Sequence, residues 1–291
     1  MPVTPVSVNF HIWKPCNDAC RFCFATFEDV RGHISADDAV RILILLREAG
    51  CEKINFAGGE PTLYPHLGRV LGESRRLGFV TSIITNGARL PQLLETNAAD
   101  LDWVGLSVDS AREGVQSAIG RGRGDHVRRS VTHFEMIRAR GLRAKLNTVV
   151  TALNWQEDMS FFVRRVRPER WKVFEVLPIE GQNDGQVEPL LITADQFRAF
   201  IDRHAVLRSE GLAPVTEDND AMSGSYVMVD PLGRFFGNAT GRYVYSDPIL
   251  AVGVEAALAQ IGWNASKFID RGGLYDWSPP GEQRLVSLRG R

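Results

Sequence analysis

Stretches rich in β-branched and aromatic residues alternate with amphipathic helical patterns along the first 180 residues of this chain. Six of these stretches have the length and composition of buried strands: Val6–Ile12, Lys53–Ala57, Val80–Thr85, Trp103–Val108, Arg143–Val149 and Lys172–Pro178. Such alternation is typical of βα units, in which each helix carries the chain back so that the next strand pairs in parallel. The sequence therefore predicts an α/β fold, a partial (β/α)6 TIM-type barrel rather than a closed barrel of eight strands.

Helical patterns fill the intervals between these strands. The predicted helices are Ala36–Ala49, Leu67–Leu77, Leu90–Asn97, His126–Arg140 and Trp155–Val166. Ser35 and Asn154 are the expected N-caps of the first and the last, because a short polar side chain can accept a hydrogen bond from the first turn. In such barrels the active site lies where strands end and βα loops begin.

After Pro178 the pattern changes to a polar stretch and then to less regular elements. A helix over Ala194–Arg208, a hairpin formed by Ser225–Asp230 and Arg234–Gly237, and a late helix over Val254–Ile261 are expected. Neither a repeat nor a Pro-rich linker interrupts the chain. We therefore expect residues 1–180 to form the barrel core and residues 181–291 to form a C-terminal extension that closes the site within the same structural unit.

Composition excludes several classes of function. The formal net charge is −1, so the chain lacks the global basic field on which non-specific nucleic-acid binding depends. No run of about 18 apolar residues predicts a membrane span. We expect a cytoplasmic protein without a nucleic-acid or membrane partner, in a reducing compartment that keeps thiols available.

Three cysteines occur within eight residues, as Cys16, Cys20 and Cys23. Thiolates hold [4Fe–4S] clusters, and a set of three leaves one iron free to bind another molecule. A structural zinc site is the alternative, since His11 or Cys51 could supply its fourth ligand. A disulfide framework is less favoured, because no secretory segment precedes these residues.

This cysteine spacing resembles that of the radical S-adenosylmethionine (SAM) superfamily. Gly58-Gly59-Glu60-Pro61 follows the second predicted strand and resembles the superfamily's motif for the SAM amino group, and the glycines would let the backbone approach a ligand closely. The resemblance implies that a [4Fe–4S] cluster on the three cysteines binds SAM. The residues that it places around SAM are Phe24, Gly58, Gly59, Glu60, Thr85, Asn86 and Ser107.

Cations occur at alternate positions of three predicted strands, where an apolar core would make them costly. Residues i and i+2 share one face of a strand, so Lys53 points with Asn55, Lys145 with Asn147, and Arg170 with Lys172. Arg121 lies in a glycine-rich loop after the fourth strand. The pattern predicts a polar barrel interior that receives an anion, such as the triphosphate of a nucleotide.

Matches over almost the whole chain resemble the viperin family of radical SAM nucleotide dehydratases. They are Val8–His11, Glu52–Glu60, Ile119–Gly122, Lys145–Asn147, Arg170–Phe174, Ile179–Gly181, Ser225–Tyr226 and Arg271–Tyr275. The resemblance implies that a 5′-deoxyadenosyl radical takes the 4′ hydrogen of CTP, UTP or GTP, and that loss of the 3′-hydroxyl gives the 3′-deoxy-3′,4′-didehydro nucleotide. It makes Tyr226 the candidate proton or hydrogen donor. The residues that it implies for nucleotide binding are Asn9, Lys53, Asn55, Arg121, Lys145, Asn147, Arg170, Lys172 and Tyr226.

The same resemblance implies further partners: an external one-electron donor of flavodoxin or ferredoxin type, and an iron–sulfur assembly machinery. The chain ends in Leu288–Arg291 instead of the tryptophan that ends the animal forms, and it lacks their N-terminal amphipathic helix, so we expect a microbial member with a role in antiviral defence. Two alternatives remain. One is a radical SAM enzyme of cofactor biosynthesis or peptide modification, and the other is a non-catalytic sensor of nucleotide or metal.

Overall fold

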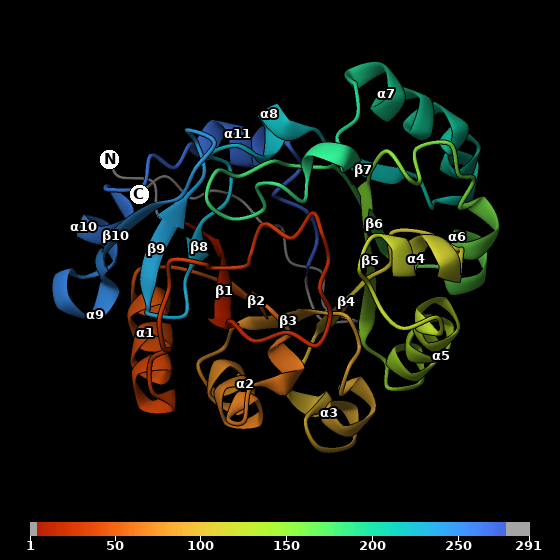
Figure 1. Ribbon diagram of the computed structural model, residues 1–291. Coiled ribbons are helices and arrows are strands. Elements are labelled where there is room, and N and C mark those ends of the chain that lie inside the picture. The colour runs from red at the N-terminus through yellow and green to blue at the C-terminus, as the bar shows by residue number, and fades with distance from the viewer. Residues whose placement is uncertain (1–4, 278–291) are drawn as a thin grey trace.

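A central parallel sheet organises the computed structural model, which describes residues 5–277. Within that span a single sheet has the strand order β10-β9-β8-β1-β2-β3-β4-β5-β6-β7. Its six parallel central strands are β1 (Ser7–Trp13), β2 (Lys53–Gly58), β3 (Val80–Thr85), β4 (Trp103–Ser107), β5 (Arg143–Val150) and β6 (Arg170–Glu175). Figure 1 shows these strands on an open arc with helices around its outside. The predicted α/β fold with a parallel sheet is confirmed.

Strands from the C-terminal part extend both edges of this arc. The predicted hairpin is confirmed as β8 (Met228–Val229) and β9 (Arg234–Gly237), which pair antiparallel and continue into β10 (Val244–Pro248). β8 also pairs in parallel with β1. At the other edge β7 (Pro214–Glu217) pairs in parallel with β6, in a segment expected to be a loop. Four residues that begin with proline give too little pattern to predict a strand, although an edge strand tolerates proline.

The main helices cover the outer face of the arc. They are α1 (Ala36–Glu48), α2 (Leu67–Arg76), α3 (Leu90–Thr96), α5 (His126–Ala139) and α6 (Ser160–Val166). α1 begins as predicted, because the Ser35 side chain accepts a hydrogen bond of 3.0 Å from the backbone N–H of Asp38. α6 begins later than predicted. Asn154 is not its cap, since its side chain accepts the N–H of Thr151 and closes a turn there.

Shorter elements complete the described part of the chain. The helices are α4 (Glu113–Ala118), α7 (Ala194–Arg203), α8 (Asn219–Met222), α9 (Ile249–Val252), α10 (Val254–Leu258) and α11 (Ala265–Asp270), and the 3-10 helices are η1 (Pro61–Leu63), η2 (Ala98–Asp100), η3 (Glu188–Leu190) and η4 (Ala205–Glu210). α7 and α10 lie within two predicted helices. No helix in this part has the length and apolarity that crossing a membrane requires. The C-terminal residues 288–291 lie outside the described residues.

The two faces of the central strands differ in chemistry. In β1, Val8, Phe10 and Ile12 are buried in the core beneath the helices, whereas Asn9 and His11 line a cavity inside the barrel. Burying each large apolar side chain stabilises the fold by about 1.5–3 kcal/mol. Polar groups facing inward supply none of that stabilisation and cost free energy unless they find partners. The barrel interior is therefore a binding site rather than a core.

Candidate active site

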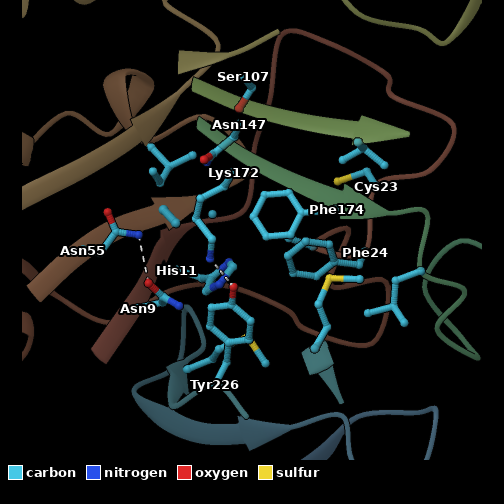
Figure 2. A pocket seen from close by; sticks show the side chains of 18 of the residues that line it. Asn9, His11, Cys23, Phe24, Asn55, Ser107, Asn147, Lys172, Phe174 and Tyr226 are labelled. Carbon is cyan, nitrogen blue, oxygen red and sulfur yellow. Dashed lines mark hydrogen bonds between the residues drawn. The ribbon is translucent and has the colours of Figure 1, made fainter. Parts of the chain in front are cut away.

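One continuous cavity of about 410 Å³ occupies the barrel interior. It runs from the loop that follows β1, at the carboxyl ends of the strands, to side chains at the amino ends of β2, β5 and β6. Figure 2 shows part of this lining. Of the predicted site residues, the following line the cavity: Asn9, Cys16, Cys20, Cys23, Phe24, Lys53, Asn55, Gly58, Gly59, Thr85, Asn86, Ser107, Arg121, Lys145, Asn147, Arg170, Lys172 and Tyr226. Glu60 does not.

The three cysteines sit on a loop fixed by backbone hydrogen bonds. Ala19 donates to the carbonyl of Gly120 at 3.0 Å, and Arg21 donates to the carbonyl of Ile119 at 2.9 Å. The thiols of Cys16, Cys20 and Cys23 are free, and all three residues line the cavity. The loop after β4 therefore holds the cysteine loop in place.

The chemistry of these thiols fits an iron–sulfur cluster. Burial raises the pKa of Cys16 to about 11, and it also raises the pKa of Cys20 and of Cys23. The thiols are protonated at neutral pH without metal, so iron binding would release protons. In residues 5–277 no three His, Cys, Asp or Glu side chains converge on a single ion. A cubane cluster does not need such convergence, since each thiolate binds a different iron.

Cys51, one of the two residues considered as a fourth zinc ligand, lies far from this loop. It precedes β2, at the opposite end of the sheet, and its buried thiol contacts the carbonyls of Val6 and Lys53. His11 lines the cavity but packs edge-to-face against Phe27 and Phe236. Within residues 5–277, neither His11 nor Cys51 completes a metal-holding group with the cysteines.

Gly58 and Gly59 line the cavity and also allow a close approach within the chain. A Cβ atom at Gly58 would lie 2.2 Å from the carbonyl oxygen of Trp13, and one at Gly59 would lie 2.0 Å from that of Lys14. The Gly59 N–H also donates to Trp13 at 2.7 Å. The glycines therefore let the end of β2 pack directly against the chain that enters the cysteine loop.

The Glu60 carboxylate is held by the turn around it and by the end of β3. It is 1% exposed. Its Oε1 atom accepts hydrogen bonds from the backbone and hydroxyl of Thr62 and from the Thr85 hydroxyl, and its Oε2 atom accepts one from the Asn86 N–H. Asn86 in turn donates through its side chain to Asn17 and contacts the Cys16 sulfur at 3.8 Å. Glu60 thus fixes the turn beside the cysteines, and its contact with the SAM amino group stays a prediction.

Cations gather at the amino-end side of the cavity around Tyr275. Lys53 and Lys145 both donate to the Tyr275 hydroxyl, and the Arg170 guanidinium lies 4.0 Å from the centre of its ring. Burial lowers the pKa of Lys53 to about 7 and that of Lys145 well below its usual value. Among the described residues, no carboxylate forms an ion pair with these three cations. They form a site that an anion would complete.

Arg121 lies apart from these cations. Its side chain forms an ion pair of 2.6 Å with Asp109. Its positive charge also opposes the rise that burial causes in the pKa of the nearby Cys20. Its guanidinium lies 5.8 Å from the centre of the Phe22 ring, within the cysteine loop. The structure therefore groups Arg121 with the cysteines and not with the predicted anion site.

Amide side chains occupy the middle of the cavity. Asn55 donates to Asn9 at 2.9 Å and accepts from Ser82, so this pair is fixed (Figure 2). Asn147 pairs in register with Ser107 on the neighbouring strand, and its Oδ1 atom is buried without a partner. An unpaired buried oxygen of this kind is a position for a ligand hydroxyl or amine to fill.

Sequence reasoning assigned no role to three residues of this site: Glu217, Arg271 and Tyr275. Glu217 ends β7 and is fully buried against Lys172 and Tyr226. Arg271 and Tyr275 lie in one of the segments that carry the family resemblance, and that match was the signal that could have placed them in the site. No sequence pattern pointed to Glu217, because β7 itself was not predicted.

Comparisons with known proteins agree with this geometry. The Radical SAM superfamily matches residues 12–161. The S-adenosylmethionine-dependent nucleotide dehydratase of Flammeovirga pacifica is 44% identical over 281 residues, which cover 93% of this chain and 96% of that protein. The S-adenosylmethionine-dependent nucleotide dehydratase RSAD2 of Danio rerio is 37% identical, with coverage of 94% and 79%.

Solved structures share the fold. A structure of anSMEcpe with bound AdoMet superposes with a TM-score of 0.69 at 15% identity, covering 91% of this chain and 79% of that one. Streptococcus suis SuiB bound to S-adenosylmethionine gives 0.66 at 18% identity, covering 80% and 60%. These likenesses bear on the fold alone.

Proposed function

Because this chain belongs to the S-adenosylmethionine-dependent nucleotide dehydratases of the radical SAM superfamily, we propose that it converts CTP, UTP or GTP to the 3′-deoxy-3′,4′-didehydro nucleotide. One observation carries the proposal: a single cavity joins three free thiols to Lys53, Lys145 and Arg170, cations that form no ion pair within residues 5–277. The thiols can hold a radical-generating cofactor, and the cations can hold a triphosphate.

Cys16, Cys20 and Cys23 would hold a [4Fe–4S] cluster. When bound, the cluster and SAM together would supply the 5′-deoxyadenosyl radical, which would remove the 4′ hydrogen. The residues proposed to surround SAM are Phe24, Gly58, Gly59, Glu60, Thr85, Asn86 and Ser107. Asn86 is the best placed of these, because its amide lies beside Cys16.

Lys53, Lys145, Arg170 and Arg271 would bind the triphosphate at the amino-end side of the cavity. The sugar then lies among Asn9, Asn55 and Asn147, near Lys172 and Tyr226. Departure of the 3′-hydroxyl needs an acid, because hydroxide is a poor leaving group. The Lys172–Tyr226 pair, hydrogen-bonded at 2.7 Å, is our candidate for this donor. An external electron carrier of flavodoxin or ferredoxin type would supply the electrons.

The test is anaerobic reconstitution followed by incubation with SAM, a chemical reductant and an equimolar mixture of nucleoside triphosphates. We expect mass spectrometry to find 5′-deoxyadenosine and one nucleotide lighter by one water. Replacing the three cysteines by alanine should remove iron and both products. Formation of 5′-deoxyadenosine without a dehydrated nucleotide would favour another radical SAM reaction, and the absence of both in an iron-loaded protein would favour a sensor. Antiviral defence is the role we propose for the product, because a nucleotide without a 3′-hydroxyl stops chain extension.

A further inference from the structure

Glu217 is a buried carboxylate that contacts both members of the Lys172–Tyr226 pair. It is 0% exposed, and in the described chain it contacts the Lys172 ammonium, the Tyr226 hydroxyl and Arg271, the last at 3.2 Å. Burial alone would raise its pKa, but the charges of Lys172 and Arg271 and hydrogen bonds from Lys172 and Tyr226 hold that pKa below its usual value. Glu217 is therefore ionised at neutral pH and can only accept hydrogen bonds.

The hydrogen positions follow from this charge. A tyrosine hydroxyl has one hydrogen, and that of Tyr226 is donated to Glu217. Its oxygen accepts a hydrogen bond of 2.7 Å from Lys172. The Lys172 ammonium has three hydrogens, of which one goes to Tyr226 and one to Glu217. The third has no hydrogen-bond partner among the described residues, and Lys172 lines the cavity, where Figure 2 shows its side chain meeting that of Tyr226.

We propose that Glu217 is a positioning residue that turns the Tyr226 hydroxyl hydrogen away from the substrate and keeps Lys172 protonated, so that Lys172 is the acid for the departing 3′-hydroxyl. In this step the C3′–O bond breaks, an N–H bond of Lys172 breaks, and the proton and hydroxide form water. The external carrier supplies the electron that completes the product. The inference rests on the proposed function and assigns the proton within it.

The charges that face Lys172 suit this role. Burial lowers the pKa of Lys172 to about 8, Glu217 opposes that shift, and Arg271 and Arg170 add to it. The Tyr226 hydroxyl is the remaining titratable group at this contact, and burial raises its pKa well above the usual value. An acid works best when its pKa lies near the working pH. Lys172 meets this condition, and Tyr226 does not.

The pH dependence of nucleotide dehydration tests the assignment. The rate should fall as pH rises through the pKa of Lys172, since the neutral amine cannot donate in this step. This fall is the alkaline limb of the pH–rate profile. In Glu217→Gln the negative charge that stabilises protonated Lys172 is lost, so the limb should move at least one pH unit lower. At pH values above the limb the rate should be about tenfold below that of the wild type. Glu217→Asp should keep the limb near its original position. Tyr226→Phe should still form product, with its alkaline limb retained.

Asp230→Asn is the matched control. Asp230 is likewise 0% exposed and paired with an arginine, Arg234, but in the described structure it contacts neither Lys172 nor Tyr226, so its loss should leave the limb unmoved. An unmoved limb in folded Glu217→Gln overturns the proposal. So does a Tyr226→Phe variant that cleaves SAM but forms no dehydrated nucleotide, and this second result decides the matter if Glu217→Gln does not fold. Absence of dehydrated nucleotide from the wild-type protein would instead refute the proposed function.

Discussion

The amino groups of Lys53 and Lys145 both donate hydrogen bonds to the Tyr275 hydroxyl, and both lysines are buried. Removing a charged group from water costs several kcal/mol, and no carboxylate of the described chain forms an ion pair with either lysine to offset that cost fully. The result is a lowered pKa for both lysines. An anion would reverse it, because an opposite charge favours the protonated form.

Binding of a nucleoside triphosphate at pH 8 should therefore take up protons. With a pKa of about 7, Lys53 is mostly neutral in the empty site at this pH, and it becomes charged when the phosphate arrives. Calorimetry in buffers with different ionisation enthalpies measures the uptake. Lys53→Met should reduce it, whereas Lys267→Met, at a more exposed pair with Asp220, should not. Equal binding heats in all buffers would contradict this.

Arg170→Ala and Lys172→Ala should each weaken binding of the nucleoside triphosphate by about tenfold to a hundredfold, the usual effect of losing a hydrogen bond that involves a charged group. Arg170 would contact the phosphates, and Lys172 would contact the sugar. Iron content should be unchanged, because neither residue contacts the cysteine loop in the described structure. Arg198→Ala removes an exposed cation at a surface pair and serves as the control. Unchanged affinity in both cavity variants would show that the triphosphate binds elsewhere.

At the scale of elements, the end of β2 and the chain leaving β1 depend on each other. Gly59→Ala would place a Cβ atom 2.0 Å from the Lys14 carbonyl oxygen and force the start of the cysteine loop to move. We expect a clear loss of iron per protein after reconstitution, measured by iron assay and absorbance. Gly114→Ala, in α4 with open space around its Cβ position, is the matched control. Full iron loading of Gly59→Ala would refute this role.

The elements that could be predicted are those with a regular local sequence pattern. The central strands follow from runs of β-branched and aromatic residues, and α1 follows from its helical pattern and a capping serine, which are local signals. Asn154 looked like a similar cap, but its amide donates to the carbonyl of Asp109 on the loop after β4, 45 residues away. β7 depends on pairing with β6 and leaves little trace in its own four residues. Tertiary contacts decided both cases.

At the scale of the whole molecule, distant parts of the chain build one site. Lys53 and Tyr275 are 222 residues apart, yet they share a hydrogen bond, and the Trp103 indole donates to the carbonyl of Trp277. The cations facing the barrel interior could be predicted from two-residue spacing in strands. Their grouping around Tyr275 could not, because no local pattern specifies where the chain beyond α11 returns.

Trp277→Ala should therefore affect both stability and binding. Trp277 is 1% exposed, and Lys53 lies 5.1 Å from the centre of its ring. Truncating a buried aromatic side chain costs about 3–5 kcal/mol, which urea unfolding would detect. Triphosphate affinity should fall as well. Phe161→Ala, at an 83% exposed side chain of α6, should change neither quantity. A variant as stable as the wild type would contradict the packing described here.

The cysteine loop lines one end of the cavity, and the C-terminal segment with Tyr275 lines the other end. Both ends rest on the same rigid parallel strands. A substrate anchored at the cation cluster therefore presents its sugar at a depth set by the number of phosphates between them. A diphosphate or monophosphate drawn to the same cations would hold its sugar farther from the cysteines. In the reaction that we propose, phosphate number would thus become a criterion of substrate selection.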